Sequence, residues 1–203
     1  MSNNTTPKHS IIKFTFFILT MFCYIINTNI ANAGSNHPIP IKGDFSLVDE
    51  TGKRVTLKGY KGKYLLIYFG YTYCPDICPT SLGIIAQSLD GLAKKSLDKI
   101  LPLFISIDPE RDTVEYIKEY TDMFHPSLVG LTGSVEEASR AAKTFGVYFA
   151  KAEINPKDKT DYSVDHSSNT YFVDPKGRII EIFGHAPQIE EVINSIESHL
   201  AKE

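Results

Sequence analysis

Two cysteines, Cys74 and Cys78, have the residue type and spacing that carry most chemical potential in this chain. They stand one position further apart than in the Cys-x-x-Cys motif of dithiol oxidoreductases. Because their separation is about one turn of an α-helix, both sulfurs can lie on one side of a helix start. Thiolates are nucleophiles and soft metal ligands, so the pair alone leaves three readings open: a metal site, a redox dithiol and a structural disulfide.

The surrounding residues predict where this pair sits in the fold. The apolar run 64–69 precedes it and is typical of a buried strand, whereas helical periodicity follows Pro79. Two thiols at the start of a helix meet its partial positive charge, which lowers the pKa of a thiol and favours the thiolate. Pro75 and Pro79 lack amide hydrogens and stiffen the segment, which presets the positions of the sulfurs.

The remaining patterns predict the elements that must hold these residues. Strands are expected at 44–48, 54–57, 64–69, 101–107, 128–131, 146–150, 170–173 and 178–183; helices are expected after Pro79, at 113–124, 134–145 and 188–200; and 154–162 is expected to be a surface loop. Strands that alternate with helices and end in a hairpin and a helix predict an α/β sandwich of thioredoxin type. Its central mixed sheet would be flanked by helices.

A metal would need a further ligand, and the candidates are histidines. The five considered are His37, His125, His166, His185 and His199. His166 has the best context, because it precedes the strand predicted at 170–173, and in a thioredoxin-like sheet that loop lies beside the turn with the cysteines. Asp165 could orient its imidazole. Two thiolates and one imidazole suit copper as Cu(I) or Cu(II), whereas a closed structural zinc site would normally need a fourth protein ligand.

An acidic cluster, Asp108, Glu110 and Asp112, follows the strand predicted at 101–107. One interpretation is local: Asp112 or Thr113 caps the next helix, whose start favours negative charge. The other interpretation is functional, with the cluster forming an acidic rim near the cysteines for docking of a partner or tuning of a metal. The sequence leaves both interpretations open.

Composition and the N-terminus bear on location. The 203-residue chain has a formal net charge of −3 and no long basic run, which argues against nucleic-acid binding. Residues 14–33 are largely apolar and end in Ala-Asn-Ala, as in an export signal or a membrane anchor. We therefore expect residues 1–13 to stay in the cytoplasm, 34–40 to form a linker, and 41–203 to form the thioredoxin-like copper-binding domain outside the bacterial inner membrane.

Three motifs together resemble those of a known family, the SCO/SenC copper chaperones for cytochrome c oxidase assembly. Residues 68–80 (Tyr-Phe-Gly-Tyr-Thr-Tyr-Cys-Pro-Asp-Ile-Cys-Pro-Thr) resemble the family's metal-site segment. Residues 106–113 resemble its Asp-Pro-x-Arg-Asp element, and residues 164–167 resemble the segment that carries its histidine ligand. The motifs occur in the family's order, and the resemblance covers roughly residue 40 to the C-terminus.

The resemblance implies a membrane-anchored, thioredoxin-like domain with one copper held by Cys74, Cys78 and His166. It further implies that the protein supplies or prepares the binuclear copper centre of cytochrome c oxidase subunit II, after receiving copper from a donor that the sequence does not identify. The protein is then a metallochaperone and not primarily an enzyme. The family is usually anchored in the periplasm or intermembrane space, so cleavage after Ala33 and release into the periplasm is the alternative.

Two rival functions use the same cysteines. A thiol-disulfide oxidoreductase would reduce the cysteines of the oxidase copper site and would not need His166, and a redox sensor would respond to copper. The oxidoreductase reading is weakened by the wide cysteine spacing and by the lack of a proline just before the strand predicted at 170–173. A peroxidase of the peroxiredoxin type fits poorly, because Thr72 lies too close to Cys74 for that motif.

Overall fold

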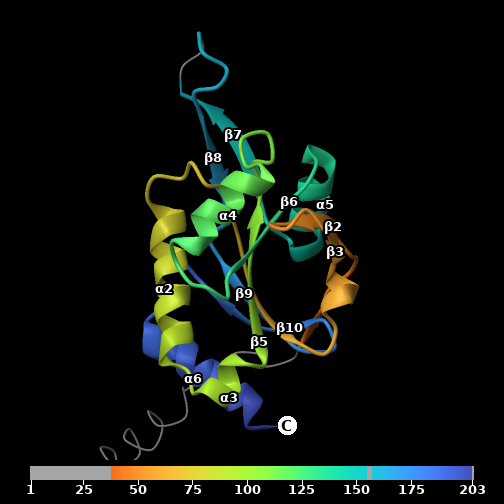
Figure 1. The fold of residues 1–203 in the computed structure, drawn as a ribbon, viewed down its shortest axis with the longest axis vertical. Coiled ribbons are helices and arrows are strands. Elements are labelled where there is room, and N and C mark those ends of the chain that lie inside the picture. Colours follow the sequence, from red (N-terminus) through yellow and green to blue (C-terminus); the bar gives the residue numbers. More distant parts are fainter. Residues whose placement is uncertain (1–37, 155–156, 203) are drawn as a thin grey trace, which may run out of the picture. The chain divides into compact units, whose positions relative to one another are not determined.

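The computed structural model describes residues 38–154 and 157–202 (Figure 1). Its elements in chain order are β1 (Ile39–Pro40), β2 (Ser46–Asp49), β3 (Arg54–Thr56), the 3-10 helix η1 (Leu57–Tyr60), β4 (Tyr64–Gly70), α2 (Ile77–Gly91), α3 (Lys94–Leu97), β5 (Ile100–Ser106), α4 (Val114–Asp122), β6 (Val129–Thr132), α5 (Val135–Phe145), β7 (Phe149–Glu153), β8 (Tyr162–His166), β9 (Thr170–Val173), β10 (Arg178–Phe183) and α6 (Ile189–Leu200).

An eight-stranded mixed sheet forms the centre of the domain, with the order β1-β10-β9-β4-β5-β6-β2-β3. Strands β4, β5 and β6 run parallel, whereas β9 pairs antiparallel with β4 and β10. Every residue of β4 is buried, since both faces of a central parallel strand are covered. The burial of both faces explains the continuous apolar run at 64–69. The mixed sheet confirms the sheet of the predicted thioredoxin-like sandwich.

Helices cover both faces of this sheet. Successive strand residues point to opposite faces, so Tyr68 and Phe69 mark the two sides. The Tyr68 hydroxyl approaches Cys78 on α2, and α4 lies on the same face, where Tyr120 packs against Phe104 of β5. On the opposite face Phe69 contacts Phe145 of α5, with ring centroids 5.4 Å apart. The cysteine-bearing helix is therefore held against the middle of the sheet.

Local sequence signals explain several helix ends. Ser134 and Glu137 form the reciprocal capping box that begins α5. The same helix ends at Gly146, whose φ of 69° is the left-handed conformation that favours glycine. Helix α4 begins at Thr113, whose side chain accepts the N–H of Tyr116. The predicted helices at 113–124, 134–145 and 188–200 are thereby confirmed to within a few residues.

Several expectations from the sequence are corrected. Residues 39–40, placed in the linker, form the edge strand β1, which pairs with Arg178 and Ile179 of β10. The strand expected at 146–150 instead spans Phe149–Glu153. The loop expected at 154–162 ends one residue early, because Tyr162 is buried and begins β8. Strand β8 is short, with buried Tyr162 and Val164 alternating with Ser163 and Asp165, and it pairs along its whole length with β7.

The expected cytoplasmic tail, the signal or anchor segment and most of the linker lie outside the described residues. Within residues 38–154 and 157–202, no helix is long and apolar enough to cross a membrane.

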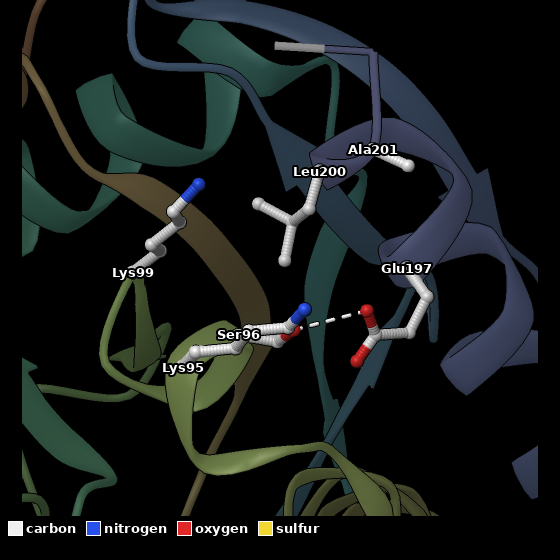
Figure 2. Close-up of a pocket in the computed structure, with 6 residues that line it drawn as sticks. All are labelled: Lys95, Ser96, Lys99, Glu197, Leu200 and Ala201. Atoms are coloured by element: carbon white, nitrogen blue, oxygen red, sulfur yellow. Dashed lines mark hydrogen bonds between the residues drawn. The ribbon is translucent and has the colours of Figure 1, made fainter.

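A small hollow of about 170 Å³ lies where α3 meets α6 (Figure 2). One hydrogen bond crosses it, from the Ser96 hydroxyl to Glu197 Oε2 at 2.9 Å. Figure 1 shows α3 and α6 at the end of the domain opposite to β7 and β8. The hollow is therefore remote from the cysteine segment and serves as a packing junction between two helices.

Candidate metal centre

The two cysteines lie between the end of β4 and the first turn of α2, as predicted. Cys74 is half-buried in the loop and Cys78 is buried in the first turn of the helix, and both are free thiols. The Asp76 side chain at the N-cap makes no capping hydrogen bond. Instead, the backbone N–H of Cys78 points at the Cys74 sulfur, 3.4 Å away. A sulfur atom thus accepts the hydrogen bond that a side-chain oxygen usually accepts at a helix start. The partial positive charge of the helix start favours a negative charge on this sulfur.

His166 joins this pair from a distant part of the sequence. It is the last residue of β8, and its Nε2 lies 3.5 Å from the Cys78 sulfur. Its Nδ1 lies 3.0 Å from the carbonyl oxygen of Ser167. If Nδ1 carries the proton and donates to that carbonyl, Nε2 presents its lone pair to the sulfurs. The expected role of Asp165 is wrong, because this residue is exposed and the backbone carbonyl orients the ring.

The ligand atoms of Cys74, Cys78 and His166 all lie within 4.8 Å of one another. Such a cluster of two sulfurs and one imidazole nitrogen is compact enough to surround a single ion. Soft sulfur ligands with one nitrogen match the preferences of copper in either oxidation state.

Aromatic rings and one glycine lie close to these groups. Tyr68 and Tyr71 present their rings edge-on to His166, with centroids 6.2 and 5.9 Å from that of the imidazole. Gly70 lies beneath Cys78, and a methyl group on it would come within 2.7 Å of the Cys78 sulfur. All three residues lie in the 68–80 motif, but their types alone do not predict these contacts. The available signal was a glycine that ends a wholly buried strand four positions before a cysteine.

Two members of the acidic cluster, Asp112 and Glu110, make different contacts. Asp112 is buried, and it accepts hydrogen bonds from the Thr72 hydroxyl and the Ser106 hydroxyl, both at 2.6 Å, and from the Thr72 N–H. Burial raises the pKa of this carboxyl group. Asp112 therefore ties the cysteine loop to the end of β5, while Thr113 provides the predicted helix cap. Glu110 is exposed and pairs with Lys151.

The remaining histidines do not join the cluster. His125 is buried, its Nδ1 accepts the N–H of Ser127, and its Nε2 lies 3.5 Å from Asp90. His199 packs against Phe172, and His185 is exposed after β10. His37 lies outside the described residues. Among the residues that the structure describes, only His166 comes together with the two cysteines to form a possible metal-binding group.

The two thiols have opposite pKa shifts. A hydrogen bond from the Cys78 thiol, supported by His166 and by backbone N–H groups, lowers the pKa of Cys74 to about 3 against the opposing effect of burial. The same hydrogen bond and burial raise the pKa of the Cys78 thiol well above its ordinary value. Without a metal, the pair therefore holds one proton, which resides on Cys78, and Cys74 is a thiolate at neutral pH.

This asymmetry predicts how the thiols react with an alkylating agent. The rate of Cys74 alkylation by iodoacetamide is expected to stay nearly constant between about pH 8 and pH 5, because a group with a pKa of about 3 remains a thiolate throughout. Cys78 should stay unmodified in the folded protein, since it is buried and protonated. Peptide-resolved mass spectrometry measures both rates. A tenfold fall in the Cys74 rate for each pH unit would contradict the lowered pKa.

The fold and the cluster together define a class: a thioredoxin-like domain with two thiols and one imidazole at the turn from strand to helix. The SCO1/SenC family description matches residues 33–201, so the chain belongs to the SCO1/SenC family. The chain is 46% identical over 158 residues to "Protein sco1" of Schizosaccharomyces pombe, an alignment that covers 77% of this chain and 60% of that protein. It spans about half the length of the curated relatives it matches.

Two solved structures are similar over most of the domain. The copper-bound ScoI of Arabidopsis thaliana has a TM-score of 0.74 and 40% sequence identity, and the match covers 80% of this chain and 99% of that one. The copper-bound ScoI of Bradyrhizobium japonicum has a TM-score of 0.70 and 42% identity, with 78% and 98% of the two chains covered. This likeness supports the thioredoxin-like fold of the domain.

Proposed function

We propose that this protein is a copper chaperone that binds one copper ion through Cys74, Cys78 and His166 and acts in the assembly of cytochrome c oxidase. The observation that carries the proposal is the convergence of their three ligand atoms within 4.8 Å. The copper-bound structures of two similar proteins support the choice of metal. Two thiolates hold Cu(I) firmly, and the imidazole helps to hold Cu(II), so the site suits both oxidation states.

The receiving site in this proposal is the binuclear copper centre of cytochrome c oxidase subunit II. Delivery requires that a ligand of the partner reach the copper before it leaves this protein. Cys74 is only half-buried, and its neighbours Tyr73 and Asp76 are exposed, whereas Cys78 is buried beneath them. The exposed Cys74 side is thus the side from which a thiolate of the partner can approach and replace the protein's ligands one at a time.

The location follows from the same proposal. We place the domain on the outer face of the bacterial inner membrane, held there by residues 14–33, or released into the periplasm after cleavage following Ala33. The copper donor would meet the protein in that compartment. Exposed thiols oxidise there unless a metal or a reductant occupies them, so a bound copper also protects the pair.

A reductase function remains the second candidate, because Cys74 is a half-exposed thiolate with a second thiol four residues away. In this reaction Cys74 attacks one sulfur of a disulfide in subunit II, and Cys78 then displaces the partner, leaving a disulfide here and two reduced thiols there. The two electrons come from the cysteine pair. His166 has no necessary part in this exchange, which separates the two functions.

One experiment tests delivery against reduction. The Cu(I)-loaded protein is mixed anaerobically with the metal-free, reduced copper domain of subunit II, and the metal-free protein is mixed with the same domain in its disulfide form. We expect copper transfer in the first mixture, and we expect the His166→Ala variant to take up less Cu(I) under the same loading conditions and so to deliver less. A variant that keeps full copper affinity and transfer, together with rapid disulfide reduction by the wild-type protein, would favour the reductase.

A further inference from the structure

His166 lies on a different sheet from the segment that supplies the cysteines. Strands β7 and β8 form a separate two-stranded sheet, whereas β4 belongs to the eight-stranded sheet. Figure 1 shows this hairpin extending away from the main sheet. No ladder of backbone hydrogen bonds joins the two sheets in the described residues. The short segment 167–169 ties the His166 end of β8 to β9, and side-chain contacts hold the rest of β8 against the cysteine segment.

Arg111 makes the most extensive of these contacts at the start of β8. Its Nη1 donates a hydrogen bond to the Tyr162 carbonyl oxygen at 3.0 Å, and its guanidinium carbon lies 3.7 Å from the centroid of the Tyr162 ring. Its Nε donates to Asp108 Oδ2 at 2.5 Å. The Tyr162 hydroxyl donates to the other oxygen of the same carboxylate at 2.7 Å. Arg111, Asp108 and Tyr162 therefore form a closed ring of contacts.

The same guanidinium reaches the cysteine segment. Its carbon lies 4.8 Å from the centroid of the Tyr73 ring and 5.7 Å from that of Tyr71. Tyr73 directly precedes Cys74, and the Tyr71 hydroxyl accepts the N–H of Val164 in β8. The Nη2 of Arg111 is buried without a hydrogen-bond partner. Contact with aromatic faces replaces hydrogen bonding there, and a planar guanidinium suits such stacking.

We propose that Arg111 is a positioning residue that fixes His166 relative to Cys74 and Cys78. It touches Tyr162 at one end of β8, and His166 is at the other end, about 13 Å along the strand at about 3.3 Å per residue. A loosened contact at Tyr162 leaves β8 held to the cysteine segment only by Tyr71 and by its link to β9, which gives the strand, and His166 with it, more freedom to shift. The inference rests on the proposed function, since it assigns Arg111 to the geometry of that site.

The chemistry of the site predicts that lysine cannot replace Arg111. An ammonium group keeps the charge and can pair with Asp108, but it has no planar face for the tyrosine rings and no second nitrogen for the Tyr162 carbonyl. Arg111→Lys thus removes the hydrogen bond to the Tyr162 carbonyl and the planar stacking on the tyrosine rings, and it preserves the ion pair with the buried carboxylate. Loss of groups that orient metal ligands typically costs about 10–100-fold in metal affinity, and we expect about tenfold here.

The test is a double-mutant cycle on Cu(I) affinity, measured by competition with a chromophoric chelator. Arg111→Lys should weaken binding about tenfold in the otherwise wild-type protein and by less than about twofold in the His166→Ala background. A residue with a merely structural role would weaken binding equally in both. Arg178→Lys is the matched control, because Arg178 also pairs with an aspartate, Asp174, but contacts neither segment. We expect it to leave copper affinity unchanged.

A second readout uses the metal-free protein. The ring centroids of Tyr71 and His166 are 5.9 Å apart, which gives a measurable nuclear Overhauser effect between ring protons. This signal should weaken in Arg111→Lys and persist in Arg178→Lys.

If Arg111→Lys does not fold, Tyr73→Leu is the substitute variant, because it removes one exposed stacking partner of Arg111. The loss of Cu(I) affinity in Tyr73→Leu should again depend on His166.

The outcomes separate the two proposals. Absence of Cu(I) binding in the wild-type protein, or unchanged binding in His166→Ala, would overturn the proposed function. Intact copper binding through His166 with no effect of Arg111→Lys, or with equal effects in both backgrounds, would overturn only the role of Arg111.

Discussion

Replacement of Cys78 by serine is expected to weaken Cu(I) binding by more than about a hundredfold, since a direct ligand should count for more than the outer partners whose loss costs about 10–100-fold. A serine hydroxyl is a hard, protonated group at neutral pH and does not replace a soft thiolate. Cys74→Ser should have a similar effect. Anaerobic competition with a chromophoric Cu(I) chelator measures each affinity, and the wild-type protein should bind one copper ion.

The His166→Ala variant should show a different dependence on the oxidation state of copper. Two thiolates remain for Cu(I), but Cu(II) loses its only nitrogen ligand, so the loss should be larger for Cu(II). His185→Ala is the control, since His185 is an exposed histidine that does not join the cluster. Equal Cu(I) and Cu(II) affinities in wild-type and His166→Ala proteins would refute a three-ligand site.

Gly70→Ala is expected to lower the free energy of unfolding by about 1–3 kcal/mol through overpacking. The new methyl carbon would lie 2.7 Å from the Cys78 sulfur and 2.9 Å from Phe104 Cε2. Both neighbours are fully buried, so neither can move aside without disturbing the core. The midpoint of thermal unfolding should fall by about 2–12 °C, and copper affinity should fall too because the sulfur is displaced.

Gly83→Ala is the matched control for this substitution. Gly83 lies in α2, the helix that also carries Cys78, and a methyl group there would meet nothing within 4 Å. Alanine restricts the unfolded chain and favours the helix, so this variant should gain about 0.5–1 kcal/mol. Calorimetry measures the free energy of unfolding of both variants, which should fall in Gly70→Ala and rise in Gly83→Ala. A Gly70→Ala protein as stable as the wild type, with unchanged copper affinity, would show that the close packing under Cys78 is not required.

Much of the domain could be predicted because its signals are local. The run at 64–69 is a strand buried on both faces, and Ser134 and Glu137 begin a helix. The sequence Asp174-Pro175-Lys176-Gly177 is a strong turn signal, and in the structure this turn joins β9 to β10. These features depend on residues close together in the chain. The short strand β8 could not be predicted in this way, since it pairs with β7 and is held by contacts with Tyr71 and Arg111.

The candidate site shows the same division. The sequence alone determined that Cys74 and Cys78 lie at the turn from a buried strand to a helix, because an apolar run precedes them and helical periodicity follows. The structure places Cys78 in the first turn of α2 and Cys74 in the loop before it. The sequence also selected His166 from its context. Only the tertiary structure decided that the imidazole reaches the sulfurs, that the Ser167 carbonyl and not Asp165 orients it, and that Gly70 gives the Cys78 sulfur its space. These are contacts between distant segments, which the packing of two sheets and a helix fixes.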